Sequence, residues 1–210
     1  MRTLRIGLTG GTGAGKTQAL REFRRLGAAT VSSDAVARDV VRPGRPAHRK
    51  IVAAFGKSVL GAGGRLDRRK LGQKIFSSPQ LRRRLERITH PEILREMERR
   101  LKALPSGRVA VADVPLLFEG RHQKRFDAVI FVSARAALRA DRVMRRDGLS
   151  RVQALRRMSA QWPEDRKAAL ADVVIANAGS REKFLAAVRE YHKALTLIAA
   201  SREASSAGPH

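Results

Sequence analysis

The chain has 210 residues, which suits one domain with insertions or two small domains, and it contains no cysteine, which excludes disulfides, thiolate metal ligands and a cysteine nucleophile. Lys and Arg number 44 against 19 Asp and Glu, and the resulting net charge of +25 attracts polyanions such as nucleic acids. The basic residues are nevertheless spread along the whole chain and aromatic residues make up only 4%, so no dedicated nucleic-acid partner is expected.

The first 26 residues predict a strand, a glycine-rich loop and a helix, in that order. Residues 4–9 form a short apolar run typical of a buried strand, and residues 17–26 have the pattern of a helix. The loop between them, residues 10–17, reads Gly-Gly-Thr-Gly-Ala-Gly-Lys-Thr and matches the G-x-x-x-x-G-K-T motif of a phosphate-binding loop. A strand before this motif and a helix after it are the context that the motif requires.

The phosphate loop predicts how a nucleoside triphosphate is bound. Its glycines let backbone N–H groups turn toward one phosphate, and the following helix directs its positive end at the same anion. Lys16 can reach the β- and γ-phosphates, and the Thr17 hydroxyl can ligate Mg²⁺. The residues expected to contact the nucleotide are Gly11, Thr12, Gly13, Ala14, Gly15, Lys16 and Thr17.

Four further strands are predicted by short apolar runs at residues 28–32, 109–113, 128–132 and 172–175. Helical patterns lie between these runs, and the last helix is expected over residues 181–199. Strands that lack polar alternation suit a parallel sheet covered by helices on both faces. The chain therefore predicts a doubly wound α/β fold with a five-stranded parallel sheet.

One long segment, residues 44–104, interrupts the alternation of strand and helix. It contains no convincing strand, and it is punctuated by the glycines of residues 61–64 and by His90-Pro91. A helical insertion at this place is where a kinase with a phosphate loop can hold its acceptor. The helices predicted within it span residues 47–55, 68–76, 79–88 and 91–104.

A second helical stretch lies between the fourth and fifth predicted strands. It is interrupted near Gly148, and we expect residues 139–166 to form a mobile lid. Residues 1–200 then make one kinase domain, followed by a small, polar and disordered tail at residues 201–210.

The compartment is predicted from what the chain lacks. The first strand begins almost at Met1, which leaves no room for a signal peptide, and no apolar run approaches the roughly 20 residues of a membrane span. We therefore expect a cytoplasmic protein that does not associate with a membrane.

Polar side chains follow two of the predicted strands, at the edge of the sheet where α/β proteins bind ligands. Asp34 follows the second strand, where it can orient an attacking hydroxyl or accept its proton, or merely cap the next helix. Asp113 ends the third strand, where it can hold Mg²⁺ through water or merely close a turn. From position alone, each of these two aspartates can have either a functional or a structural role.

The arginines and histidines give weaker indications of the active site than these two aspartates do. Arg139, Arg142, Arg145 and Arg146 lie on or near one predicted helix, and lid arginines stabilise charge on a transferring phosphoryl group. In so basic a chain, however, any single arginine is more often solvated than catalytic. Five scattered histidines without paired ligand spacing argue against a structural metal site.

Taken in order, these segments resemble the dephospho-coenzyme A kinase family over the whole chain except its tail. The most specific of them is the Asp-Val-Pro-Leu-Leu-Phe-Glu stretch of residues 113–119, which separates this family from other kinases with a phosphate loop. The other matching segments are residues 7–17, 33–41, 55–56, 66–71, 88–91, 142–147, Gln161 and 171–177.

The resemblance implies transfer of the γ-phosphoryl group of ATP to the ribose 3′-hydroxyl of dephospho-CoA, the last step of CoA synthesis, with Mg²⁺ as cofactor. It implies that Asp34 is the catalytic base with Thr9 beside it, and that Asn177 lies near the adenine of ATP. It also makes Arg142 the catalytic lid arginine, so removal of Arg139 or Arg145 is expected to change turnover only a few-fold.

The resemblance also implies which residues face the acceptor, and two positions of the phosphate loop differ from the usual family pattern. Arg38 and His90 would face dephospho-CoA, although His90 is equally well explained as the entry to a helix at Pro91. The family usually has an apolar residue at the position of Thr12 and serine at that of Ala14. Little effect is expected, because the loop binds phosphate through its backbone.

Three other functions remain as alternatives. A kinase for another small metabolite, such as a nucleoside monophosphate, is disfavoured by the helical insertion and by residues 113–119. A nucleic-acid-binding ATPase would explain the +25 charge and would lose affinity steeply with salt. A nucleotide-binding regulator without chemistry is disfavoured by the presence of Lys16, Thr17, Asp34 and Arg142.

Overall fold

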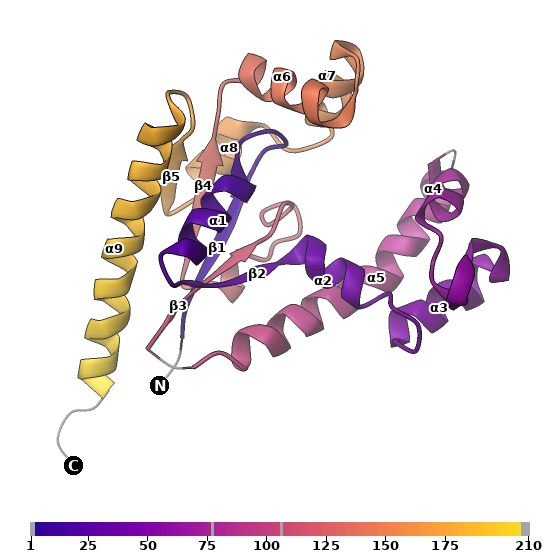
Figure 1. Ribbon diagram of the computed structural model, residues 1–210, viewed down its shortest axis with the longest axis horizontal. Coiled ribbons are helices and arrows are strands. Elements are labelled where there is room, and N and C mark those ends of the chain that lie inside the picture. Colours follow the sequence, from indigo (N-terminus) through magenta and orange to yellow (C-terminus); the bar gives the residue numbers. More distant parts are fainter. Residues whose placement is uncertain (1–2, 77, 106, 207–210) are drawn as a thin grey trace. The chain divides into compact units, whose positions relative to one another are not determined.

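A computed structural model of the chain describes residues 3–76, 78–105 and 107–206 (Figure 1). The contacts divide the chain into two compact units. The sheet unit consists of Met1–Val31 and Ala103–His210, and the helical unit consists of Ser32–Lys102. The helical unit thus begins earlier than the insertion that the sequence predicted from residue 44.

The sheet has five strands, and all of them were predicted from apolar runs. Their order is β2-β3-β1-β4-β5, in which β1 pairs in parallel with β3 and β4, and β4 with β5. Leu8 of β1 lies opposite Asp113 of β3, which places Asp113 at the carboxyl edge of the sheet. The doubly wound α/β fold is confirmed. The strands are β1 (Leu4–Gly10), β2 (Ala29–Ser32), β3 (Val109–Asp113), β4 (Ala128–Ser133) and β5 (Val173–Ala176).

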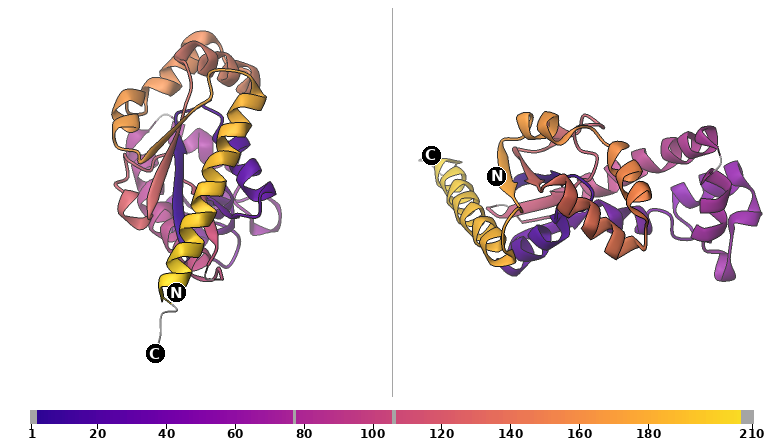
Figure 2. Two further views of the ribbon diagram at one scale, coloured as in Figure 1. Left: turned by 90° about the vertical axis from the view of Figure 1, so that its left-hand side faces the viewer. Right: turned by 90° about the horizontal axis from the view of Figure 1, so that it is seen from above.

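One face of the sheet packs against two helices, α1 (Lys16–Arg25) and α9 (Arg181–Ser206). Figure 2 shows α9 running alongside the strands. Alternate residues of the strands point to this face because side chains of a strand alternate between the two sides of a sheet. The apolar core there includes Ile6, Leu8, Phe23, Val111, Ile130, Phe184 and Val188.

The other face of the sheet is covered by the segment that follows β3 and by α8 (Glu164–Ala169). Leu117 and Phe118 of that segment are fully buried. Leu117 approaches β1 so closely that a Cβ on Gly7 would lie 2.7 Å from its methyl group, so a larger residue there would force this side chain to shift. The remaining helices of the sheet unit are α6 (Ala136–Asp147) and α7 (Arg151–Ser159), and η3 (Gln123–Arg125) is a 3₁₀ turn.

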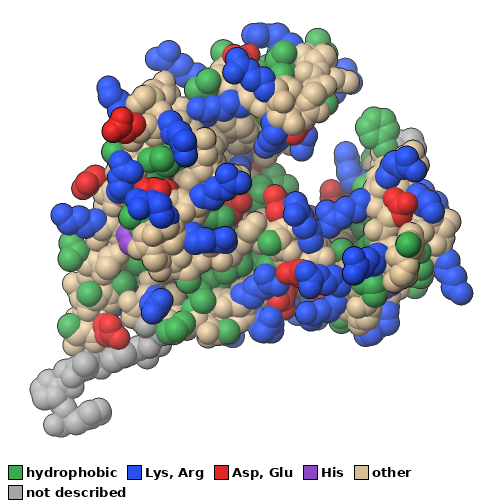
Figure 3. Space-filling model, viewed as in Figure 1, with side chains coloured by type: hydrophobic (Ala, Val, Ile, Leu, Met, Phe, Trp, Pro, Cys, Tyr) green, Lys and Arg blue, Asp and Glu red, His purple; other side chains and the backbone are tan. Residues whose placement is uncertain are grey.

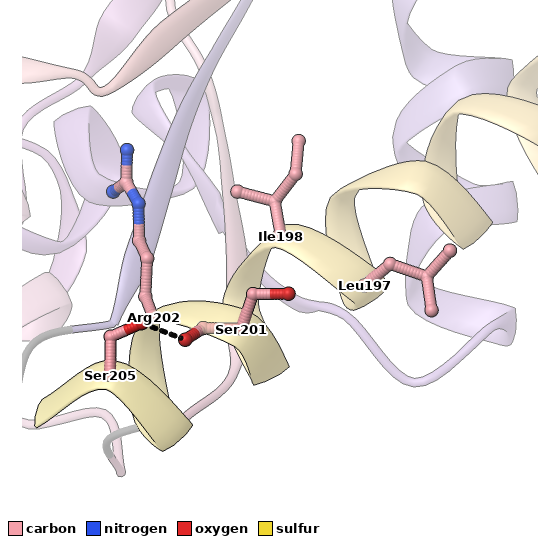
Figure 4. A pocket seen from close by; sticks show the side chains of 5 residues that line it. All are labelled: Leu197, Ile198, Ser201, Arg202 and Ser205. Carbon is pink, nitrogen blue, oxygen red and sulfur yellow. Dashed lines mark hydrogen bonds between the residues drawn. The ribbon is translucent and has the colours of Figure 1, made fainter. Parts of the chain in front are cut away.

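The C-terminal helix is longer than predicted. The sequence predicted a disordered tail from residue 201, but α9 continues to Ser206, and residues 207–210 lie outside the described residues. Tertiary contacts stabilise the extra turns: Ala199 is buried, and Arg202 forms an ion pair with Asp127 at 3.0 Å. The Ser205 hydroxyl donates to the Ser201 carbonyl at 2.9 Å (Figure 4). A cavity of about 490 Å³ lies against this end of α9 (Figure 4), and none of the predicted site residues lines it.

The helical unit has its own small core, made by Ile51, Phe55, Val59 and Leu71. Two 3₁₀ turns, η1 (Lys57–Val59) and η2 (Ala62–Gly64), connect two of its helices. The α-helices of this unit are α2 (Ser33–Asp39), α3 (Pro46–Phe55), α4 (Arg68–Phe76) and α5 (Pro79–Lys102).

The predicted break at His90-Pro91 is wrong, because α5 passes through Pro91 without ending. Proline in a helix removes one backbone hydrogen bond and disfavours the preceding turn. Here the Thr89 hydroxyl donates to the Leu85 carbonyl at 3.0 Å in that turn, and α5 packs against α2, α3 and α4. Tertiary packing therefore outweighs the local preference for a break.

The surface of both units is strongly basic. On the face shown in Figure 3, Lys and Arg side chains are scattered over both units and do not gather in one patch. Many of them pair with a carboxylate one turn away on the same helix, as Arg95 does with Glu92 and Arg99 with Glu96. Among the described residues, no helix is long and apolar enough to cross a membrane.

One ion-pair cluster joins α1 to α9. Glu22 of α1 is 7% exposed and pairs with Arg25 at 2.8 Å and with Arg189 of α9 at 3.2 Å. The hydrogen bond from Arg25 lowers the pKa of Glu22 to about 2, although burial acts in the opposite direction. The folded protein thus favours the ionised carboxylate more than the unfolded chain does.

We expect Glu22→Gln to lower Tm at neutral pH, and to do so less in acid. Because the pKa of Glu22 is lower in the folded state, its carboxylate stabilises the fold fully above about pH 4.5, and this contribution is lost as the pH falls toward about 2. Thermal melts across this range measure the Tm difference from wild type, which should shrink with acidification. Glu190→Gln, an exposed change on α9, is the control. A Glu22→Gln difference that is independent of pH would contradict the assignment.

Candidate active site

The phosphate loop connects β1 to α1 and has the backbone conformation that its glycines predict. Gly13 and Gly15 have φ angles of 82° and 108°, a region that side chains with a Cβ rarely adopt. Space is also restricted, because a Cβ on Gly13 would lie 2.6 Å from the Arg139 carbonyl oxygen. A Cβ on Gly15 would collide with the side-chain amide of Asn177. The motif therefore needs glycine at both positions for conformation and for packing.

Lys16, the first residue of α1, lies against this loop. Its ammonium group donates to the Gly10 carbonyl at 2.7 Å and to the Gly11 carbonyl at 3.4 Å. Backbone N–H groups at the start of a helix and a nearby ammonium both favour an anion. The loop and Lys16 can therefore bind the phosphates of a nucleotide.

Two predicted residues, Asn177 and Arg142, hold the loop from its other side. Asn177 directly follows β5 and is 2% exposed, and its amide donates to the Ala14 carbonyl at 2.8 Å. Arg142 of α6 donates to the Gly13 and Ala14 carbonyls at 3.3 and 3.4 Å, and to the Asn177 side-chain oxygen at 3.3 Å. The structure thus brings both residues to the phosphate loop, while contact of Asn177 with adenine remains a prediction.

Two residues to which the sequence gave no specific role, Arg139 and Gln161, also contact the loop. Arg139 is 5% exposed, donates to the Thr12 carbonyl at 3.0 Å and forms an ion pair with Glu164 at 2.9 Å. The side-chain oxygen of Gln161 accepts from the Thr12 backbone N–H at 2.9 Å. The spacing of Arg139 from Val143, which puts both on one face of α6, is the signal that could have revealed the burial of Arg139.

Asp113 and Thr17 offer the oxygen atoms that Mg²⁺ prefers. Asp113 is 7% exposed at the end of β3, and Thr17 is an exposed residue in the first turn of α1. Mg²⁺ in kinases is bound by one or two such groups together with phosphate oxygens and water. A carboxylate and a hydroxyl beside a phosphate loop fit that requirement.

Thr9 occupies a different environment from the one its predicted role suggested. Its side chain is fully buried, and its hydroxyl lies 3.4 Å from the Pro115 carbonyl oxygen, to which it donates. This contact joins β1 to the segment after β3. Contact of Thr9 with a substrate stays a prediction.

Asp34 and Arg38 lie on α2 in the helical unit, where both line a cleft of about 1190 Å³. The cap of α2 is Ser32, whose hydroxyl accepts from the Ala35 backbone N–H at 3.4 Å. Asp34 is therefore exposed in the first helical turn and is not the capping residue. The capping alternative for Asp34 is thereby removed.

The remaining lining of this cleft combines cations and apolar side chains. Thr89 belongs to it, whereas its neighbour His90 is exposed on α5 and is not among the lining residues. The cationic and apolar residues that line it include Arg42, Arg65, Arg68, Ile51, Leu71, Ile75 and Leu85. Such a lining suits a ligand with a phosphorylated part and an extended, less polar part.

Comparison with known proteins gives a consistent result. The family model that matches the chain describes dephospho-CoA kinase and covers residues 4–183. The dephospho-CoA kinase of Syntrophotalea carbinolica is 47% identical over 180 residues, which cover 85% of each chain. That of Carboxydothermus hydrogenoformans is 42% identical over 179 residues, covering 84% of this chain and 87% of the relative.

Two solved structures share the fold over nearly their whole length. A Thermus thermophilus protein, TT1252, has a TM-score of 0.77 at 34% identity and covers 91% of this chain and 97% of its own. The dephospho-CoA kinase of Campylobacter jejuni has a TM-score of 0.68 at 24% identity and covers 92% and 97%. At that identity the second likeness concerns the fold alone.

We expect Arg142→Ala to weaken ATP binding by more than about tenfold, because Arg142 contacts the phosphate loop and its charge would attract the bound phosphates. Arg145→Ala, an exposed change on the same helix, is the matched control and should alter affinity only a few-fold. Both changes remove one positive charge, so a general electrostatic effect would make them alike. Calorimetric titration with ATP and Mg²⁺ measures both, and equal losses would contradict a specific role for Arg142.

Proposed function

Since the chain belongs to the dephospho-CoA kinase family, we propose that it transfers the γ-phosphoryl group of ATP to the ribose 3′-hydroxyl of dephospho-CoA, the last step of CoA synthesis, in the cytoplasm. The observation that carries the proposal is the family match over residues 4–183, which includes the phosphate loop and the helical unit. The products are CoA and ADP.

The sheet unit binds the donor in this proposal. The N–H groups of the phosphate loop and the ammonium of Lys16 bind the β- and γ-phosphates, and Arg142 adds charge as the phosphoryl group leaves. Thr17 and Asp113 would hold Mg²⁺, which would supply positive charge to neutralise the phosphates.

The helical unit binds the acceptor. Its cleft of about 1190 Å³ exceeds that of most small-ligand sites, as a long acceptor requires. Arg38 and the other arginines of the cleft suit the diphosphate of dephospho-CoA, and the apolar side chains suit its pantetheine arm. His90 contributes at the acceptor side without belonging to this cleft, and Thr9 acts through the segment after β3.

Asp34 acts on the acceptor hydroxyl. Its carboxylate orients the 3′-hydroxyl and takes its proton as the oxygen bonds to the γ-phosphorus and the bond to the β,γ-bridging oxygen breaks. The transition state of phosphoryl transfer is loose, so orientation contributes more than basicity. The exposure of Asp34 in the first turn of α2, with helix capping left to Ser32, supports this role.

Residues 139–166 form the lid. Gly148 ends α6 in the left-handed conformation and so separates α6 from α7, which supports a place where the chain bends. Arg142 and Gln161 of this segment contact the phosphate loop directly. Closure over ATP would exclude water and suppress hydrolysis.

We expect Lys16→Ala to reduce turnover of dephospho-CoA by at least about a hundredfold while Tm is retained, because its ammonium interacts with the transferring phosphates. Lys193→Ala, an exposed change on α9, removes the same charge as a control. A coupled assay should offer dephospho-CoA, a nucleoside monophosphate and RNA as rival acceptors or activators. Activity that depends on either of the last two, or near-normal turnover of Lys16→Ala, would overturn the proposal.

We expect Asp34→Asn to lower kcat strongly and to leave the KM for ATP and the Tm nearly unchanged. Asparagine keeps the shape of the side chain but cannot take a proton. Ser32→Ala is the complementary variant: loss of the helix cap should cost about 1 kcal/mol of stability with little effect on kcat. Kinetics and thermal melts on both variants separate the two roles, and an Asp34→Asn enzyme with unchanged kcat would exclude Asp34 as the base.

A further inference from the structure

An ion pair between the buried Arg139 and the half-buried Glu164 lies against the phosphate loop. Arg139 of α6 donates from Nε to the Thr12 carbonyl at 3.0 Å, and its Nη1 lies 2.9 Å from Oε1 of Glu164 on α8. We propose that Arg139 is a positioning residue that directs the Gly13 N–H into the phosphate loop and thereby sets the affinity for ATP, with Glu164 holding its guanidinium in place. This inference rests on the proposed function only in taking ATP as the ligand.

The space around the loop shows how closely the pair is fitted. A Cβ on Gly11 would lie 2.5 Å from Nη2 of Arg139 and would collide with the Glu164 carboxylate. At Gly13 the backbone of Arg139 itself approaches, with its carbonyl oxygen 2.6 Å from the position of a Cβ. The loop is therefore packed against α6 and the ion pair over several consecutive residues.

Peptide geometry links the hydrogen bond on the Thr12 carbonyl to the direction of the next N–H, which belongs to Gly13. In a trans peptide the C=O and the following N–H point in opposite directions. When Arg139 holds the Thr12 carbonyl, the N–H of Gly13 is directed away from Arg139 and into the loop. Asn177 acts in the same way on the Ala14 carbonyl and hence on the N–H of Gly15. N–H groups aimed in this way bind an anion without rearrangement.

Arg139 differs in this respect from Arg142. Arg139 is 5% exposed, and its guanidinium contacts a carbonyl and a carboxylate, so we infer that it supports the loop and does not serve as a ligand for phosphate. The sequence treated Arg139 and Arg145 as equivalent, whereas Arg145 is exposed. Because Arg139 is buried against the loop, we expect its replacement to have a larger effect than the few-fold change expected from the sequence.

Glu164 is itself firmly held. The helix that carries it, α8, is anchored by a second ion pair, in which the buried Lys167 ammonium lies 2.6 Å from Glu119. Glu119 also accepts from the Trp162 backbone N–H at 3.3 Å, and the Arg166 guanidinium lies 3.6 Å above the Trp162 ring. These contacts fix α8 relative to the segment after β3, so the position of Glu164 follows from the fold.

Removing Arg139 alone is an ambiguous test, because it strands the Glu164 carboxylate and destabilises the protein for that reason. Two double variants avoid this: Arg139→Gln with Glu164→Leu, and Arg139→Met with Glu164→Leu. Nε2 of glutamine and Cε of methionine both occupy the fourth position along the side chain, as Nε of arginine does. Of these two replacements only glutamine can donate to the Thr12 carbonyl.

Calorimetric titration with ATP and Mg²⁺ should give the glutamine variant a Kd within about threefold of wild type, and the methionine variant a Kd about tenfold weaker, as loss of one hydrogen bond implies. The Tm values of the two variants should agree, since neither retains a buried charge at these positions. Hydrogen exchange should be faster at the Gly13 amide of the ATP-bound methionine variant.

Equal ATP affinities in the two variants would overturn the inference, whether both match wild type or both are weakened. Should leucine at position 164 prevent folding, the same comparison is made with Glu164→Gln. Failure of the proposed function has a different signature: wild-type protein would bind ATP and show the contrast between the variants, yet would not phosphorylate dephospho-CoA.

Discussion

The phosphate loop depends on one constraint, which is that its carbonyl groups are held by donors from other parts of the chain. The carbonyls of five consecutive residues, from Gly10 to Ala14, all accept hydrogen bonds from side chains, and the donors are Lys16, Arg139, Arg142 and Asn177. Because each trans peptide directs its N–H opposite to its C=O, fixing the carbonyls orients the amides. In the proposed function, affinity for phosphate then arises from a backbone that is arranged before the nucleotide binds.

Three of these donors come from elements of the sheet unit: Asn177 follows β5, and Arg139 and Arg142 lie on α6. Asn177 directly follows β5, so its position is set by the sheet, and its backbone N–H donates to the Ser133 carbonyl at the end of β4 at 2.7 Å. Arg139 and Arg142 come from α6, three residues apart and thus on one face of that helix. The sheet and α6 therefore determine where these donors lie relative to the loop.

The sequence predicted what local pattern determines and missed what tertiary packing determines. Short apolar runs located every strand to within about a residue, and the glycine spacing located the loop. Pro91 and the small residues after Ser201 carried a local preference for a break or a tail, but packing of α5 and the Arg202–Asp127 ion pair outweighed it. Local propensity is a weak guide where such contacts form.

The candidate site shows the same division. Lys16 and Thr17 are specified by a motif, whereas Arg139 and Arg145 are the same residue type on one helix, and only the spacing of Arg139 from the buried Val143 separates them in the sequence. Composition counts 44 cations without distinguishing a solvated guanidinium, whose field salt screens over about 8 Å, from a buried one that is screened far less. The exposed cations can hasten the approach of an anionic substrate, whereas the donors that contact the phosphate loop can fix the geometry in which it is bound. Arginine therefore contributes in two separate ways: exposed arginines give the protein its large net charge, and arginines that contact the loop fix its geometry.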